Sequence, residues 1–191
     1  MARSKKGITY FEHPGKENTE EVLRLAKKRA EELGIKDFVV ASTSGETGAK
    51  ASLVFKGFNL TVVTHCTGFR EPGTQELTEE NRKIIEQNNG KILTGVHAFM
   101  NVERAIRNKF NTAYPTEIMS QTLRFFGEGM KVAVEIVTMA ADAGMIPVDR
   151  EAISIAGTGG GADTAIVVQP VNTTRIFDLA VKEIIAKPRT R

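Results

Sequence analysis

The chain has 191 residues, of which 41% are hydrophobic, and its 26 basic and 23 acidic side chains give a formal net charge of +3. This composition excludes a wholly disordered chain, and the length predicts one domain over residues 1–191. The basic residues are not gathered into one charged stretch, because Lys27, Lys28 and Arg29 are followed by Glu31 and Glu32. We therefore do not expect a nucleic-acid-binding protein.

The cysteine content and the apolar runs of the sequence indicate the cellular compartment of the protein. The only cysteine, Cys66, cannot form an intrachain disulfide, and the first residues lack the apolar stretch of a secretory signal. We expect a cytoplasmic protein. The most apolar run, Met130–Ile146, contains three charged residues and is too short to cross a bilayer, so no membrane association is expected.

The first half of the chain alternates between helical and strand patterns. Residues 1–16 contain Gly7, Pro14 and Gly15 and are expected to form an irregular or short extended arm. The patterns that follow predict a helix from Thr19 to the stop at Gly34, a strand over Phe38–Ala41, a helix over Ala49–Lys56, a strand over Leu60–Thr64, a helix capped by Thr78 and ending at Asn88, and a strand over Lys91–Thr94.

The second half continues this alternation. It predicts a short helix over Asn101–Asn108, a long helix over Thr116–Ala143 that breaks or bends near Gly127 and Gly129, and strands over Ile153–Ala156 and Ala165–Gln169. The last segment fits either type of element. Phe177, Leu179 and Val181 alternate as in a strand, while a helix would place Phe177 and Val181 on one face, and we favour the strand.

Alternating strands and helices predict a three-layer α/β/α fold with an open, mainly parallel sheet. In such a sheet the ligand binds at the carboxyl ends of the strands. The polar or glycine-rich loops that follow the predicted strands should therefore share one edge: Ser42–Gly48, His65–Gly68, Thr94–His97 and Gly157–Gly161.

The loop after the first buried strand has the composition of an anion-binding site. Small residues let backbone N–H groups approach an oxyanion, hydroxyls add donors, and the following helix contributes the positive end of its dipole. The expected contacts to a phosphate are Ser42, Thr43, Ser44, Gly45, Thr47 and Gly48. The alternative is that Ser44 only caps the helix and Gly45 only makes a turn. The loop lacks the lysine of a nucleotide-triphosphate-binding P-loop.

Two further motifs allow both a functional and a structural interpretation. The run Gly157, Thr158, Gly159, Gly160 can support a flat ring or a phosphate by close backbone approach, or it can be a flexible connection. His65 beside Cys66 raises the hypothesis of a cysteine nucleophile, although neighbours at a strand end point to opposite sides, and packing is the favoured role. His13 and His97 have no companions at metal-ligand spacing, so no metal is expected.

The segment from Phe38 to Thr47, its helix and the strand Leu60–Thr64 resemble the C-terminal α/β domain of pyruvate kinase. In that domain a strand ends in a Thr-x-Ser-Gly-x-Ser-type loop that binds the phosphate of a sugar bisphosphate effector. Residues 153–170 are similar to that domain's closing pair of strands. The resemblance implies the sheet order 3-2-1-4-5 with an antiparallel last strand. Thr43 and Glu46 depart from it, since they stand where the kinase loop often has basic residues.

The whole chain is also similar to a group of stand-alone archaeal and bacterial proteins of this fold that are associated with flavin mononucleotide (FMN). This resemblance implies FMN as cofactor, with its phosphate at residues 42–47 and its ring near Thr67, Gly68 and residues 157–160. Three hypotheses follow: an FMN-binding protein that acts as an oxidoreductase, a non-catalytic sensor of a phosphorylated metabolite that forms a ligand-responsive homo-oligomer, and a Cys66–His65 hydrolase or transferase.

Overall fold

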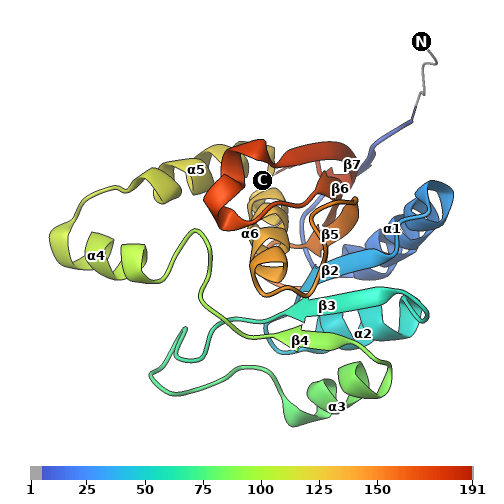
Figure 1. Cartoon of the computed structure of the whole chain (residues 1–191), viewed down its shortest axis with the longest axis horizontal. Helices are drawn as coiled ribbons and strands as arrows, with labels where there is room; N and C mark the ends of the chain where they lie inside the picture. Colours follow the sequence, from blue (N-terminus) through green and yellow to red (C-terminus); the bar gives the residue numbers. More distant parts are fainter. Residues whose placement is uncertain (1–5, 191) are drawn as a thin grey trace.

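A seven-stranded sheet forms the middle layer of the protein, for which a computed structural model describes residues 6–190 (Figure 1). Its strands lie in the order β1-β7-β6-β5-β2-β3-β4. They are β1 (Thr9–Phe11), β2 (Asp37–Ala41), β3 (Asn59–Val63), β4 (Lys91–Leu93), β5 (Ala152–Ala156), β6 (Thr164–Gln169) and β7 (Ala180–Pro188).

The strand directions confirm the expected sheet. Strands β4, β3, β2 and β5 are parallel neighbours, and β6 runs antiparallel to β5. These five are the strands expected in the order 3-2-1-4-5. Two further strands extend the sheet, because β7 pairs antiparallel with β6 and the N-terminal arm supplies β1 as a parallel edge strand on β7.

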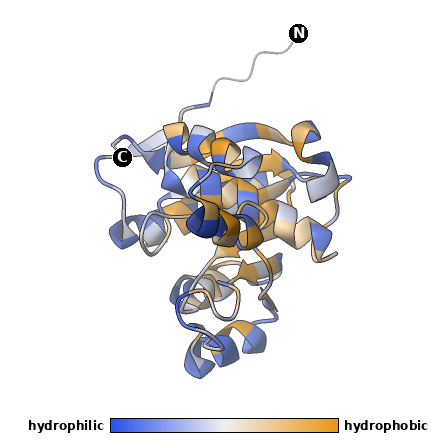
Figure 2. Ribbon diagram, turned by 90° about the vertical axis from the view of Figure 1, so that its left-hand side faces the viewer, coloured by the Kyte–Doolittle hydropathy of each residue, from blue (hydrophilic) through white to orange (hydrophobic). Residues whose placement is uncertain are grey.

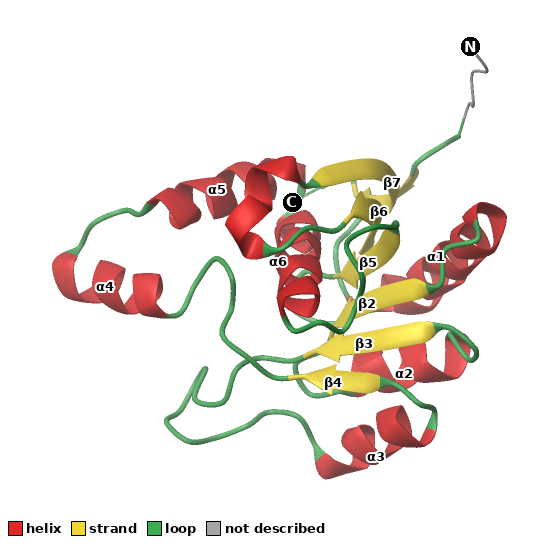
Figure 3. Ribbon diagram, viewed as in Figure 1, coloured by secondary structure: helices red, strands yellow, loops and turns green. Residues whose placement is uncertain are grey.

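Helices cover both faces of the sheet (Figure 3). The helices are α1 (Thr19–Leu33), α2 (Glu46–Val54), α3 (Glu79–Gln87), α4 (Val102–Phe110), α5 (Pro115–Leu123) and α6 (Glu128–Asp142), with short 3-10 helices at Lys16–Asn18, Arg124–Phe126 and Thr173–Asp178. Apolar side chains of α1, α2 and α3 pack in one core, and those of α6 pack in a second core. This is the predicted three-layer α/β/α architecture.

The sequence of β2 shows why both faces are covered. Phe38 and Val40 belong to the core beneath α1 and α2, whereas Val39 belongs to the core beneath α6. All three side chains are fully buried. A strand that buries successive side chains has to be apolar at every position, which produces the continuous apolar run seen in the sequence. Orange, apolar segments accordingly gather at the centre of the ribbon in Figure 2.

The long helical pattern between residues 116 and 143 is interrupted as expected. Gly127 adopts φ 116°, a conformation that favours glycine, and separates the segment of α5 from α6. Gly129 has a different function: a Cβ there would lie 2.3 Å from Thr164 Oγ1, so the glycine lets α6 pack closely on β6. The C-terminal segment is a strand, as favoured, preceded by the short helix at Thr173–Asp178.

Helix α2 begins earlier than predicted. The expected start was Ala49, but the helix starts at Glu46, so Thr47 and Gly48 lie in its first turn and not in a loop. The reason is the hydroxyl of Ser42, which accepts a hydrogen bond from the Gly48 N–H at 3.0 Å and caps the turn from six residues away.

Helices α4 and α5 lie beyond the carboxyl ends of β3 and β4, on the side to which the arrowheads of these strands point (Figure 1). Helix α4 buries none of its residues. The described part of the chain contains no helix with the length and apolar character needed to span a membrane.

Candidate functional site

A large cavity opens at the carboxyl ends of the parallel strands, with a volume of about 1170 Å³. Its walls combine the loop after β2, the ends of β2 and β3, the glycine loop after β5, and residues of α4, α5 and α6. The cavity therefore joins the four loops that the sequence places at one edge, and helices α4 to α6 complete its outer side. It exceeds the usual range of roughly 300–1,000 Å³ for small-molecule sites.

The loop after β2 contributes hydroxyls, and the structure divides them into two groups. Ser42 is buried and accepts the bond from Gly48, while Thr43 lies 3.3 Å from the Nε2 atom of His65. Ser44 and Thr47 also line the cavity, and Ser44 Oγ holds only a long 3.4 Å bond from the N–H of Glu46. Ser44 and Thr47 are therefore the hydroxyls with capacity left for an anion.

Two glycines of this loop serve packing and do not line the cavity. Gly45 has φ 91°, and a Cβ there would lie 2.5 Å from Leu77 Cδ1. A Cβ on Gly48 would lie 2.6 Å from Val62 Cγ1, so this glycine lets α2 approach β3. Both glycines are thus required for packing, and the structure places neither of these two expected phosphate contacts in the cavity lining.

The glycine loop after β5 is held by a buried carboxylate that the sequence analysis did not single out. Asp163 is fully buried and accepts hydrogen bonds from the N–H groups of Thr158 (2.9 Å) and Gly15 (3.2 Å). Gly159 and Gly160 line the cavity, and a Cβ on either would meet no atom within 4 Å. Their backbone forms an open surface that a ligand can approach closely.

The structure does not bring every predicted residue to this site. Gly157 lines the cavity, but Thr158 does not, and its N–H is used by Asp163. Thr67 and Gly68 also lie outside the cavity lining, where the Gly68 N–H bonds to the carbonyl of Thr74 at 2.8 Å. The long loop between β3 and α3 folds on itself there and moves these two residues away from the expected ring position.

His65 and Cys66 have separate partners. The imidazole of His65 bonds to Glu76 through Nδ1 (2.7 Å) and to Thr43 through Nε2, and it stacks on Phe69 at 3.8 Å between ring centroids. The sulfur of Cys66 instead accepts a bond from the Asn101 amide at 3.1 Å. Both ring nitrogens of His65 are thus bonded to residues other than Cys66, so His65 is not positioned to activate the thiol.

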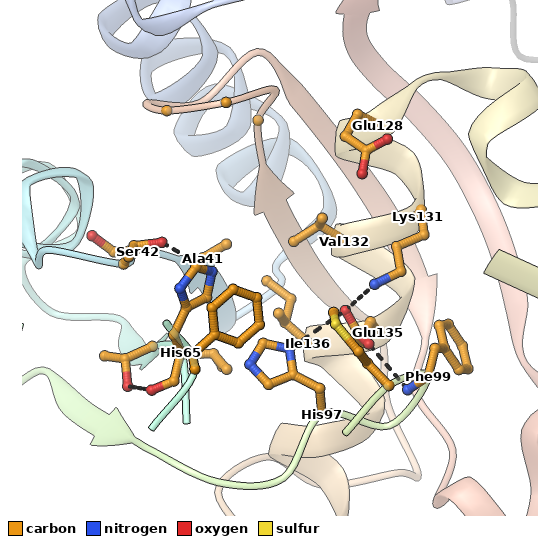
Figure 4. A pocket seen from close by; sticks show the side chains of 18 of the residues that line it. Ala41, Ser42, His65, His97, Phe99, Glu128, Lys131, Val132, Glu135 and Ile136 are labelled. Atoms are coloured by element: carbon orange, nitrogen blue, oxygen red, sulfur yellow. Dashed lines mark hydrogen bonds and ion pairs between the residues drawn. The ribbon is translucent and has the colours of Figure 1, made fainter. Parts of the chain in front are cut away.

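The wall formed by α6 contains a buried ion pair. Lys131 and Glu135 lie one helical turn apart, are each only 2% exposed, and contact each other through Nζ and Oε2. Glu135 also accepts the Phe99 N–H at 3.0 Å. Figure 4 shows this pair beside His97 and across the cavity from Ala41, Ser42 and His65. In the sequence these residues stand out only as charges within an apolar run.

Burial by itself would raise the pKa of the Glu135 carboxyl, but His97 and the ammonium group of Lys131 outweigh it, so the pKa lies below its ordinary value. The carboxylate is therefore ionised at neutral pH and balances the buried charge of Lys131. Such a pair costs desolvation energy and rarely stabilises a fold more than apolar residues would. Its position on a cavity wall suggests a role in ligand binding.

Buried polar atoms without partners mark the same cavity. Among the residues that the structure describes, four buried side-chain atoms lack a hydrogen bond, and three of them belong to cavity residues: His97 Nδ1, Thr116 Oγ1 and Ser120 Oγ. His97 Nδ1 is 3.7 Å from Glu135 Oε2, too far for a hydrogen bond. Leaving such atoms unpaired costs about 1–3 kcal/mol each, which a bound polar group would recover.

Cationic side chains surround the opening, and most of them are paired. Arg70 contacts Glu76 at 2.9 Å, Lys50 contacts Glu46 at 3.5 Å, and Arg124 contacts Glu128 at 2.7 Å. Arg107 lines the cavity and pairs with Glu117. Over residues 6–190 no group of three metal-binding side chains is assembled. The charges of this rim favour a single phosphate group over a polyphosphate.

The fold and the cavity together define a class: an α/β domain with a cavity at the carboxyl ends of its parallel strands, where sheets of this kind bind their ligands. The family model described as pyruvate kinase, alpha/beta domain, matches residues 20–168. The chain belongs to this family. The match extends from α1 through β6 and so includes every wall of the cavity except the residues before α1.

Proposed function

We propose that this protein binds a phosphorylated small molecule in the cavity, that FMN is this ligand, and that the complex acts as an oxidoreductase. The observation that carries the proposal is the group of unpartnered buried atoms, His97 Nδ1, Thr116 Oγ1 and Ser120 Oγ, on one cavity that also receives the β2 loop. Buried polar atoms in native proteins almost always have partners. A ligand with polar groups at both ends would satisfy both walls.

The residues present fit FMN in three places. Ser44 and Thr47, at the start of α2, suit a single terminal phosphate, because the helix dipole and hydroxyl donors favour an anion. The open backbone of Gly159 and Gly160 suits a flat ring. When bound, FMN would supply hydride or electron transfer, and Lys131 and His97 would hold the polar edge of the ring.

The cavity leaves room for a second molecule. Its volume of about 1170 Å³ is larger than one such cofactor requires, and its outer side is made by α4 and α5. A substrate beside the ring would complete an oxidoreductase. The single free cysteine, Cys66, suits a reducing cytoplasm as the setting.

The test is to purify the protein and measure what it holds. We expect a yellow protein whose copurifying molecule has the mass of FMN, and whose melting temperature rises on titration with FMN. Ser44→Ala combined with Thr47→Ala should lose this retention. Ser52→Ala removes a hydroxyl that bonds within α2 to the Ala49 carbonyl and should retain the ligand. A colourless protein that FMN does not stabilise would refute the proposal.

A second candidate function is a non-catalytic sensor of a phosphorylated metabolite, and family membership favours it. The exposed apolar side chains of the α4 and α5 region, including Phe110, Ile118 and Phe125, would serve a ligand-responsive homo-oligomer. Stabilisation by sugar phosphates in preference to FMN, together with a ligand-dependent change in oligomeric state, would support this candidate over the first.

A further inference from the structure

We propose that Thr43, His65 and Glu76 form a nucleophile, base and orienting carboxylate for acyl transfer, with carboxylic esters as the substrate class. The three side chains are connected in series: Thr43 Oγ1 lies 3.3 Å from His65 Nε2, and His65 Nδ1 lies 2.7 Å from Glu76 Oε2. All three residues line the cavity. A nucleophile within hydrogen-bond reach of a base that is itself oriented by a third group is the arrangement that activates a hydroxyl.

The protonation of His65 follows from its neighbours. Glu76 also contacts the guanidinium of Arg70 at 2.9 Å, and a carboxylate with two such partners accepts hydrogen bonds. Nδ1 of His65 therefore donates its proton to Glu76. In the neutral imidazole this leaves the lone pair of Nε2 facing Thr43, so that the threonine hydroxyl is the donor.

The imidazole is held in this orientation by more than its hydrogen bonds. It stacks on Phe69 with an interplanar angle of 24°, and the Gln75 amide bonds to the backbone carbonyl of His65 at 3.1 Å. The 3.3 Å between hydroxyl and Nε2 is within the looser range found before a substrate binds. The side chains of His65 and Glu76 are 26% and 22% exposed, so that the group is accessible from the cavity.

Thr43 also occupies a favourable place in the fold. It lies between the end of β2 and the start of α2, on a turn fixed by the bonds from Ser42 N to the Val63 carbonyl and from Gly48 N to Ser42 Oγ. A nucleophile on a strand-to-helix turn faces the site at the edge of the sheet, as in the α/β-hydrolases. The amides of the first turn of α2 would stabilise a developing oxyanion.

In the reaction, Thr43 Oγ1 attacks the ester carbonyl carbon while His65 Nε2 takes the hydroxyl proton. The bond from the carbonyl carbon to the leaving oxygen then breaks, and His65 returns the proton to that oxygen. Water, deprotonated by His65, then attacks the acyl carbon, the bond from that carbon to Thr43 Oγ1 breaks, and His65 returns the proton to Oγ1 as the carboxylic acid leaves. No oxidant is needed. This relay of Thr43, His65 and Glu76 does not depend on the proposed function. Only the further statement that the ester carries a phosphate, held by Ser44 and Thr47, rests on the proposed function.

The experiment treats the full chain with an alkyl fluorophosphonate and with p-nitrophenyl acetate. The reagent should form a bond from phosphorus to Thr43 Oγ1 with loss of fluoride, and peptide mass spectrometry should locate it there. Thr43→Val should abolish labelling. His65→Gln should reduce both the labelling rate and ester hydrolysis about 100-fold or more, as expected for loss of a general base. Cys66→Ala is the matched control and should change neither.

Wild-type protein that is neither labelled nor hydrolytic would overturn the relay, and so would label on Cys66 or labelling of Thr43 that His65→Gln leaves unchanged. Labelling and ester hydrolysis are also measured on the wild-type protein, so the proposal is tested even where a substitution impairs folding. Measuring FMN retention in the same samples separates the two proposals. A yellow protein without labelling refutes the relay alone, and a labelled protein that does not bind FMN refutes the proposed function alone.

Discussion

The two walls of the cavity are built on different principles. The wall at the ends of β2 and β3 presents side chains that solvent can reach, such as Ser44, whose hydroxyl has one long hydrogen bond, and the partly exposed imidazole of His65. The wall of α6 holds Lys131 and Glu135, which are almost completely buried and paired with each other. The first wall can exchange partners when a ligand arrives, whereas the second is already neutralised and rigid. Removing one charge of the second wall should therefore lower stability strongly, whereas changes in the first wall should affect ligand binding with little loss of stability.

The largest expected effect tests the α6 wall. Glu135→Gln leaves the Lys131 ammonium buried without a counter-charge and should lower the free energy of unfolding by about 3–5 kcal/mol. The measurement is urea denaturation. Glu128→Gln on the same helix breaks a partly exposed pair with Arg124 and should cost below about 1 kcal/mol.

Equal losses in these two variants would show that the buried pair stabilises the protein no more than the partly exposed one, and would contradict the stability role given to the α6 wall. The combination of Lys131→Met with Glu135→Leu sharpens the test further. It removes both charges together and should recover most of the stability lost in Glu135→Gln.

The next largest effect is expected for a substitution of Asp163, the buried carboxylate that holds the glycine loop after β5. Asp163→Asn keeps the volume but replaces the carboxylate by a neutral amide with one acceptor oxygen, so the charge-assisted bonds from the N–H groups of Thr158 and Gly15 are weakened. The loss should be about 1–3 kcal/mol in denaturant unfolding, with a weaker affinity for FMN because the loop is released. Asp178→Asn, at an exposed pair with Arg175, is the matched control. An affinity that does not change would mean that the loop does not contact the ligand.

Substitutions at two neighbouring glycines of the loop after β5 test protein stability and ligand binding separately. Gly161 has φ 68°, and a Cβ there would lie 2.4 Å from Lys16 Cα, so Gly161→Ala should cost about 1–3 kcal/mol. Gly160→Ala adds its methyl group to open space in the cavity and should leave the melting temperature of the ligand-free protein unchanged, while FMN affinity falls. Isothermal titration of both variants measures this. If Gly160→Ala binds like the wild type, the ring does not lie there.

The smallest effect is the pH dependence of the α6 wall. The pKa of Glu135 is lower in the folded protein than its ordinary value. Its contribution to stability is therefore complete above the ordinary carboxyl pKa and is lost as the pH falls through the folded value, by about 1.4 kcal/mol for each unit of lowering. The stability difference between the wild type and Glu135→Gln should shrink between pH 5 and pH 3. A constant difference over this range would contradict the lowered pKa.

The sequence predicts the sheet because its physical cause is local. A strand covered on both faces is predominantly apolar, as in Phe38–Ala41 of β2 and in Ile153–Ala156 of β5, where the one polar residue, Ser154, bonds to the Ala133 carbonyl. The break at Gly127 is local as well, since only a residue without a Cβ adopts that backbone conformation easily. The start of α2 was misplaced because its cap, Ser42, acts from six residues away.

Part of the site was also predictable, because its position follows from the direction of the strands. Parallel strands bring their carboxyl ends to one edge, so Ser44, Thr47 and the glycine loop could be expected together. Nothing in the local pattern places Thr67 and Gly68, because the loop that carries them folds on itself. The contacts between Thr43, His65 and Glu76 join positions up to 33 residues apart, and only the pairing of β2 with β3 makes them neighbours.

Short-range chemistry in the sequence determined the layers and the hydroxyl-rich turn at the edge of the sheet, since burial and backbone preference depend on each residue and its nearest neighbours. The strand order followed only from the resemblance to the pyruvate kinase domain. The tertiary structure alone decided which side chains share the cavity. Lys131 and Glu135 in sequence are two charges in an apolar helix, and folding places them against His97 and Phe99 in a wall where charge must be paired. Long-range packing sets such partnerships, because the energy of a buried charge depends on everything that surrounds it.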